Sequence, residues 1–377
     1  QQVVSEEGLN AYGAATWGQF FIYQGFNEHC GWMHTSTWAD AIDQYLEVVE
    51  TGDDGQYYYQ YGDEKRLVEQ EDVVIPYRKE GQILEQSFTI YRTHHGPIIG
   101  EKDGKWVAFR MMHRPTDALI QDFQRTKAKG YRDFRKSMKL RTNSSNNTVF
   151  ADRRGTIAYW HGNYIPKRNP NYSYDDYVDG SDPAQDWDGL HELKEMIRLR
   201  NPKSGWLQNC NSTPFTASAD SDNPTASDYP RYMAPDLENF RGVQARDELG
   251  SRMAFTLDSL ILVANSAHLA AFDALIPDLV AAYEEVGSPK DRNLSPAITL
   301  LNGWDCNIDV SSIAATVAIS WAEKALNMAY RQAPLEVRRK DMFDLWIKEY
   351  ISAEDKIRLL QESLAELEEN FGSWQTP

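Results

Sequence analysis

The sequence predicts an α+β fold, in which a sheet-rich part carrying one helix precedes a helical part. Two patterns predict it. Short runs of β-branched and aromatic residues separated by turns fill the first 165 or so residues, and apolar residues at helical spacing begin near residue 254. Between them, residues 165–250 form polar, turn-rich loops, and such long loops usually serve function. We therefore predict a β-rich domain over residues 1–250 and a helical domain over residues 251–377.

Strands are predicted where β-branched and aromatic residues cluster or alternate, at residues 73–76, 88–91, 105–110, 148–152 and 156–160. Asp103 and Gly104 form a tight turn that enters the third of these strands. Gly155 stands between the last two strands, where a hairpin needs positive φ. Tyr131 and Phe134 recur with Met138 at helical spacing, so residues 117–140 are predicted to form one helix that lies on the sheet.

Apolar residues at helical spacing predict three helices in the C-terminal part, and the sequence shows no internal repeats. The apolar positions of the three helices are Ile276, Leu279, Val280 and Tyr283, then Val317, Trp321, Ala325, Met328 and Ala329, then Met342, Leu345 and Trp346.

The composition excludes several classes of protein. The 377 residues include 39 basic and 56 acidic side chains, a net charge of −17 that argues against a nucleic-acid partner, because phosphate binding needs clustered Lys and Arg. No run approaches the roughly 18–20 apolar residues of a membrane-spanning helix. The three cysteines fit neither a disulfide framework nor the spacing of a zinc site. Aromatic residues make up 12% of the chain, which suits large cores or an apolar ligand cleft.

Residues 25–43 are the segment richest in chemically active side chains. His29 and His34 could bind a metal, but no third ligand stands at metal spacing, so buried or surface histidines are the alternative. Ser36 could be a nucleophile, but no G-x-S-x-G turn surrounds it. Asp40 and Asp43, with the Ile42 carbonyl between them, form half of an oxygen cage for Ca²⁺, and a solvated acidic loop is the alternative.

A second cluster places side-chain amides at Gln208, Asn209 and Asn211, after the short strand at residues 206–207. Such amides can donate to a developing oxyanion, or they can simply cap turns. Arg241, beside Gly242, could clamp a carboxylate or form a surface ion pair.

Taken in order along the chain, these segments and their neighbours resemble the β-chain of the penicillin acylase family of N-terminal-nucleophile (Ntn) amidohydrolases. The matching segments are Gly25, Asn27, Trp32 and Thr35 with Asp40 and Asp43, then residues 91–97, 151–168, 187–190, 201–205 and 209–214. The resemblance covers residues 8–250 and implies an Ntn-type αββα sheet sandwich, here incomplete, with a helical subdomain.

The family's chemistry gives the candidate residues specific roles. A precursor cuts itself and exposes a Ser whose own α-amine activates its hydroxyl. A backbone N–H and a side-chain amide then stabilise the oxyanion. The resemblance implies that Ser36 supplies the N–H, that Asn211 supplies the amide, and that Arg241 helps to hold the substrate and the amine terminus. It also implies a Ca²⁺ site made by Asp40, the Ile42 carbonyl and Asp43. Asp222 is a further ligand in this reading, with Asp220 as its rival.

The sequence departs from the family pattern upstream of Gly25, where no serine fits the nucleophile. We therefore expect these residues to be an internal β-chain fragment that is inactive by itself and lacks the nucleophile and the α-chain of the same precursor. The parent protein is expected to cleave an acyl amide, penicillin-like, an N-acyl-homoserine lactone or a related N-acyl amine, in the periplasm or after secretion. The alternative is a non-catalytic or carbohydrate-active extracellular binding protein.

Overall fold

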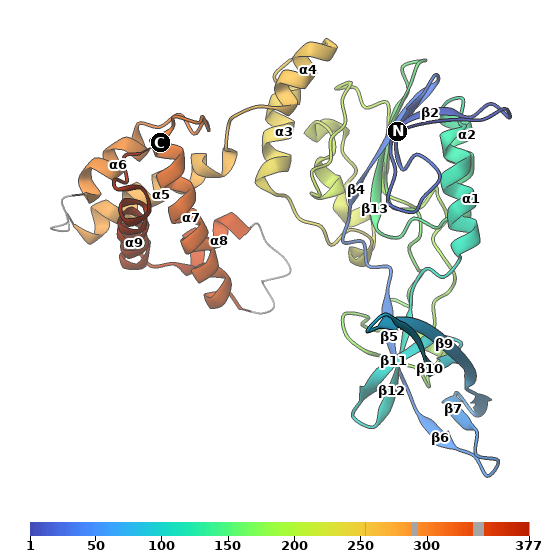
Figure 1. Cartoon of the computed structure of the whole chain (residues 1–377). Coiled ribbons are helices and arrows are strands. Elements are labelled where there is room, and N and C mark those ends of the chain that lie inside the picture. Colours follow the sequence, from blue (N-terminus) through green and yellow to red (C-terminus); the bar gives the residue numbers. More distant parts are fainter. Residues whose placement is uncertain (253, 288–292, 335–342, 377) are drawn as a thin grey trace. The chain divides into compact units, whose positions relative to one another are not determined.

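The computed structural model describes residues 1–252, 254–287, 293–334 and 343–376, and its fold is α+β as predicted (Figure 1). The chain divides into two compact units, which are described separately. The first comprises Gln1–His34, Trp38–Thr156 and Trp160–Ile197, and the second comprises Thr35–Thr37, Ile157–Tyr159 and Arg198–Pro377. The predicted domain boundary at residues 250 and 251 stays a prediction.

The largest sheet has the strand order β1-β2-β3-β4-β13-β14-β16. Its strands are β1 Gln2–Val4, β2 Asn10–Ala14, β3 Gln24–Asn27, β4 Cys30–Ser36, β13 Asn146–Asp152, β14 Ile157–His161 and β16 Arg198–Arg200. The predicted hairpin at residues 148–160 forms β13 and β14, and Gly155 between them has a φ of +84°. The backbone there takes the left-handed conformation that glycine adopts without steric cost.

Two further sheets lie in the first unit, in the strand orders β15-β5-β12-β11-β10-β9 and β6-β7-β8. Their strands are β5 Asp43–Glu47, β6 Val49–Thr51, β7 Tyr57–Tyr61, β8 Glu64–Leu67, β9 Glu69–Lys79, β10 Gln82–Thr93, β11 Gly96–Lys102, β12 Lys105–Arg110 and β15 Val178–Asp179. The predicted strands at residues 73–76 and 88–91 form parts of β9 and β10, which pair antiparallel with Val73 opposite Phe88.

The single helix predicted over residues 117–140 is wrong, because the segment forms α1 (Pro115–Thr126), α2 (Tyr131–Ser137) and a short 3₁₀ turn (Met138–Leu140). Gly130, with a φ of +143°, interrupts it. The Asp152 carboxylate accepts the Tyr131 N–H at 3.2 Å and satisfies the start of α2. The helices do lie on the sheet as expected (Figure 1), and the Phe134 ring packs 4.8 Å from Phe150 and 6.0 Å from Trp160, centroid to centroid.

The second unit carries most of the helices. They are α3 Phe240–Gly250, α4 Leu257–Ala264, α5 Ala270–Val286, α6 Leu294–Asn302, α7 Ile313–Gln332, α8 Phe343–Tyr350 and α9 Ala353–Phe371. The three helices predicted from apolar spacing correspond to α5, α7 and α8, and Met342, predicted in the third, lies outside the described residues. Trp321 is fully buried among α5, α6, α8 and α9 side chains, and its indole N–H donates to the Lys356 carbonyl at 3.1 Å.

Nowhere in the described part of the chain does a helix reach the length and apolar character that crossing a bilayer requires.

Candidate active site

Ser36 and Asn211, which are far apart in the sequence, meet in the structure. Ser36 ends β4 and is exposed, and Asn211 is half-buried in the loop after residue 208. The Asn211 side-chain Nδ2 donates to the Ser36 carbonyl oxygen at 3.1 Å. The predicted amide donor therefore contacts the residue that is predicted to supply the backbone N–H, through that residue's carbonyl oxygen.

Arg241, near the start of α3, fixes which way the Asn211 amide faces. Its Nη1 and Nη2 both donate to Asn211 Oδ1 at 3.2 Å. A guanidinium has only donors, so it must face the amide oxygen and leave the NH₂ group on the Ser36 side. The three predicted catalytic residues thus form one connected group, while their roles in catalysis stay predictions.

Asn209 shapes the turn that presents Asn211. Its Oδ1 accepts hydrogen bonds from the Thr35 hydroxyl at 2.5 Å and from the Asn211 N–H at 3.0 Å, and its Nδ2 donates to the Ser212 carbonyl at 2.9 Å. Asn211 has a φ of +58°, a left-handed conformation that Asn tolerates better than most residues. Asn209 therefore stabilises the turn, which is the turn-capping role considered as the alternative for this cluster.

Asn239 joins this loop to α3, and sequence reasoning missed it. Its Oδ1 accepts the Gly242 N–H at 3.0 Å as the N-cap of α3, and its Nδ2 donates to the carbonyls of Cys210 at 3.1 Å and Asn211 at 3.3 Å. A Cβ at Gly242 would lie 2.2 Å from Glu238 Oε1 and 2.9 Å from the Ser212 hydroxyl. A larger residue at position 242 would therefore displace the Glu238 and Ser212 side chains.

The acidic group predicted to bind calcium contacts an arginine instead. Arg168 donates to both carboxylate oxygens of Asp40, at 2.8 and 2.9 Å, and to both of Asp43, at 2.9 and 3.0 Å. It also lies 3.5 Å from the Ile42 carbonyl, and the Trp187 indole donates to Asp43 at 2.5 Å. The side chains of Arg168 and Asp43 are 2% and 0% exposed.

This arrangement does not fit the predicted ion. A calcium ion needs the same carboxylate and carbonyl oxygens at 2.3–2.6 Å, and here the guanidinium already binds them. Burial raises the pKa of Asp43, although the charge of Arg168 opposes that change. The further candidates belong to the second unit, where Asp222 accepts the Ser204 N–H at 2.8 Å and Asp220 pairs with Arg246 at 2.9 Å.

The histidines of the same segment do not form a metal site. Over the described ranges, the group of His, Cys, Asp and Glu side chains close enough to hold an ion is His94, His95 and Asp186, which contains neither His29 nor His34. His34 is buried, with Nδ1 3.2 Å from both the Asn147 carbonyl and the Thr148 hydroxyl.

The burial of His34 makes a pH dependence of stability predictable. Burial, followed by the charge of Arg125, lowers the pKa of His34 to about 3. The unfolded chain binds a proton at this residue below about pH 6.5, whereas the folded chain does not until about pH 3. As the pH is lowered from about 6.5 to about 3, the free energy of unfolding should therefore fall by about 1.4 kcal/mol per pH unit.

Denaturant unfolding between pH 6 and pH 5 measures this slope. His34→Gln should make it shallower, whereas His113→Gln, at an exposed histidine, should not. Equal slopes in the two variants would show that His34 does not cause this pH dependence of stability.

Comparison with known proteins identifies the family of this chain. The penicillin amidase family model matches residues 1–376. Penicillin G acylase from Escherichia coli is 25% identical over 218 residues, an alignment that covers 55% of this chain and 25% of that protein. A thermostable penicillin G acylase from Alcaligenes faecalis aligns structurally with a TM-score of 0.71 and 18% identity, covering 98% of this chain and 73% of that chain.

The matched segment is thus about a quarter of the curated relative's length. The structural likeness confirms the predicted Ntn-hydrolase fold. The family match extends over almost every residue, so the chain belongs to the penicillin amidase family.

Proposed function

We propose that the protein containing this chain hydrolyses the amide bond between an acyl group and an amine. The observation that carries the proposal is the orientation of Asn211, whose NH₂ group faces Ser36 while its oxygen is held by Arg241. Positioned donors of this kind stabilise the charge that develops on a carbonyl oxygen during acyl transfer.

The reaction we propose begins with a serine at the amino terminus of the mature β-chain, supplied by a segment outside these residues. Its hydroxyl attacks the substrate carbonyl carbon while its own α-amine takes the proton. The Ser36 N–H and Asn211 Nδ2 stabilise the oxyanion, the amine leaves with the proton, and water then cleaves the resulting ester. Because the nucleophile lies elsewhere, we expect no turnover from residues 1–377 alone.

Arg241 is a positioning residue in this scheme, because it acts through the Asn211 oxygen. The substrate class we propose is penicillin-like amides, N-acyl-homoserine lactones or related N-acyl amines. The partner we propose is an α-chain released from the same precursor by self-cleavage, and the location is the periplasm or the exterior of the cell. The family match supports each of these proposals.

N-terminal sequencing and intact mass of the protein from its native source test the proposal directly. A mature β-chain that begins with Ser upstream of residue 1, together with release of amine from an N-phenylacetyl or N-acyl amide, is the expected result. Replacing that Ser with Ala in the precursor should abolish both self-cleavage and turnover. A parent with another residue at that position would overturn the catalytic proposal and leave an acylase fold used for binding, the carbohydrate-binding alternative included.

A further inference from the structure

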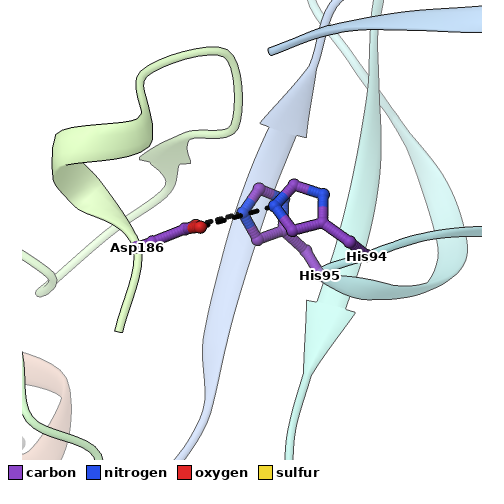
Figure 2. Close-up of side chains that lie close together, drawn as sticks. All are labelled: His94, His95 and Asp186. Atoms are coloured by element: carbon purple, nitrogen blue, oxygen red, sulfur yellow. Dashed lines mark hydrogen bonds and ion pairs between the residues drawn. The ribbon is translucent and has the colours of Figure 1, made fainter. Parts of the chain in front are cut away.

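Two adjacent histidines in the first unit point toward one carboxylate (Figure 2). Thr93 of β10 pairs with Gly96 of β11, so His94 and His95 form the two-residue loop between these strands. His95 Nε2 lies 2.6 Å from Asp186 Oδ1, and His94 Nε2 lies 3.5 Å from Asp186 Oδ2. One ligand atom from each of the three residues falls within 4.8 Å of the others.

The loop that carries the histidines is held tightly. A Cβ on Gly96 would lie 2.2 Å from the Phe109 carbonyl oxygen of β12, so only glycine allows this approach of the two strands. The Tyr45 ring stacks on the His95 ring at 3.8 Å between centroids. Both features fix His95 before any ligand binds.

Each of the three residues has a second partner on its far side. His95 Nδ1 lies 2.8 Å from Oε1 of Glu47, which is 0% exposed and also accepts the Thr93 hydroxyl at 2.6 Å. His94 Nδ1 lies 3.0 Å from the Tyr59 hydroxyl, and the Tyr61 hydroxyl donates to Asp186 Oδ2 at 2.6 Å. Metal-binding histidines almost always donate their other N–H to a carboxylate or a similar acceptor, which aims the remaining nitrogen at the ion.

The charges around the group also favour a cation. Glu47 and Asp186 flank His95, and Arg110 approaches Asp186 only to 3.6 Å. These two carboxylates therefore favour a positive charge at His95.

We propose that His94 Nε2, His95 Nε2 and a carboxylate oxygen of Asp186 bind a transition-metal ion of the zinc class. Two imidazoles and a carboxylate suit zinc, and three protein ligands leave a fourth position for water. Tetrahedral zinc holds its ligand atoms about 3.4 Å apart. His94 Nε2 lies 3.5 Å from Asp186 Oδ2, whereas His95 Nε2 lies 2.6 Å from the other oxygen, Oδ1. The carboxylate must therefore shift so that one oxygen faces both nitrogens, as the His95 Nε2 proton leaves to the solvent.

The ion can reach the site from solvent, because the His94 and Asp186 side chains are 28% and 24% exposed. Asp186 follows the 3₁₀ turn Pro183–Gln185, so a bound ion would join that loop to the β10–β11 hairpin. The proposed role is therefore to stabilise the first unit, independently of the acyl-transfer chemistry.

Calorimetric titration of tag-free, metal-stripped native protein with Zn²⁺ tests the proposal, with Co²⁺ absorption as a report of tetrahedral nitrogen and oxygen ligands. Binding of one Zn²⁺ per chain and a rise in the unfolding temperature are expected. His94→Ala, at a surface position, should weaken binding at least tenfold, and Asp186→Asn should do the same. His113→Ala removes an exposed histidine elsewhere in the chain and should bind as the unaltered protein does.

Two results would overturn the proposal. Absence of Zn²⁺ binding at 100-fold molar excess would leave His95 as a protonated bridge between Glu47 and Asp186. Unchanged affinity in His94→Ala would place any bound ion elsewhere. Neither result bears on the proposed amide hydrolysis, which involves none of these residues.

Discussion

Replacing Arg168 with Ala should lower the free energy of unfolding by about 3–5 kcal/mol, the usual cost of leaving a buried charge without its partner. The Asp43 side chain is 0% exposed, and Arg168 donates to both of its oxygens. Denaturant unfolding measures the loss. Arg154→Ala, at an exposed arginine, is the matched control and should change stability by no more than about 0.5 kcal/mol. A loss below about 1 kcal/mol in Arg168→Ala would contradict the assignment.

Arg168→Ala also tests whether the guanidinium or a calcium ion binds the carboxylate oxygens of Asp40 and Asp43. Adding Ca²⁺ to the unaltered protein should leave its unfolding midpoint unchanged, because Arg168 binds the oxygens that the ion would need. In Arg168→Ala those oxygens become free to bind a cation, and millimolar Ca²⁺ should restore part of the lost stability. Stabilisation of the unaltered protein by Ca²⁺ would instead support the ligand set predicted from the sequence.

Asn211→Ala should reduce kcat of the processed, active protein by about 10²–10³, the usual cost of removing one oxyanion donor. The loss should fall on kcat rather than KM, because the donor acts on charge that exists only in the transition state. Steady-state kinetics on an acyl amide measure the effect.

Asn171→Ala, at an exposed loop position, is the control for this substitution and should keep full activity. Equal unfolding temperatures would show that Asn211→Ala folds. A correctly folded Asn211→Ala protein within threefold of full activity would remove Asn211 from the proposed mechanism.

Local patterns predicted most of the fold, because strand alternation and helical spacing act over a few residues. The strands predicted around Val73 and Phe88 are parts of β9 and β10, and the helices predicted around Leu279 and Val317 are α5 and α7. The order of strands in the sheets could not be derived in this way. Gly130 is itself a local sign of a helix break, whereas the partner of the second helix's first N–H, Asp152, lies 21 residues from Tyr131 and could not be read from the local pattern.

In the candidate site, too, residues on recognisable motifs could be predicted, whereas partners distant in the sequence could not. Ser36, Asn211 and Arg241 were found because a resemblance placed each on a motif, and the structure brings them together. Arg168 lies 125 residues from Asp43, so its pairing could not be read from the spacing of the acidic loop. In the sequence, His94 and His95 stand out only as members of the matching segment at residues 91–97, because Asp186 and Glu47 reach them through tertiary structure.

The contact between Arg241 and Asn211 has a consequence for the ensemble of states that the site occupies. The two ends of an amide are nearly identical in shape, so packing alone leaves its two flipped orientations almost equally populated. A hydrogen bond to a charged group contributes about 1.5–3 kcal/mol, which favours one orientation by roughly tenfold or more. In the proposed reaction a flipped Asn211 would present its carbonyl oxygen to the oxyanion and repel it, and the Ser36 carbonyl, which accepts from Nδ2, favours the same orientation as the guanidinium. Arg241 and the Ser36 carbonyl together therefore raise the fraction of molecules in which the Asn211 NH₂ group faces the proposed oxyanion site.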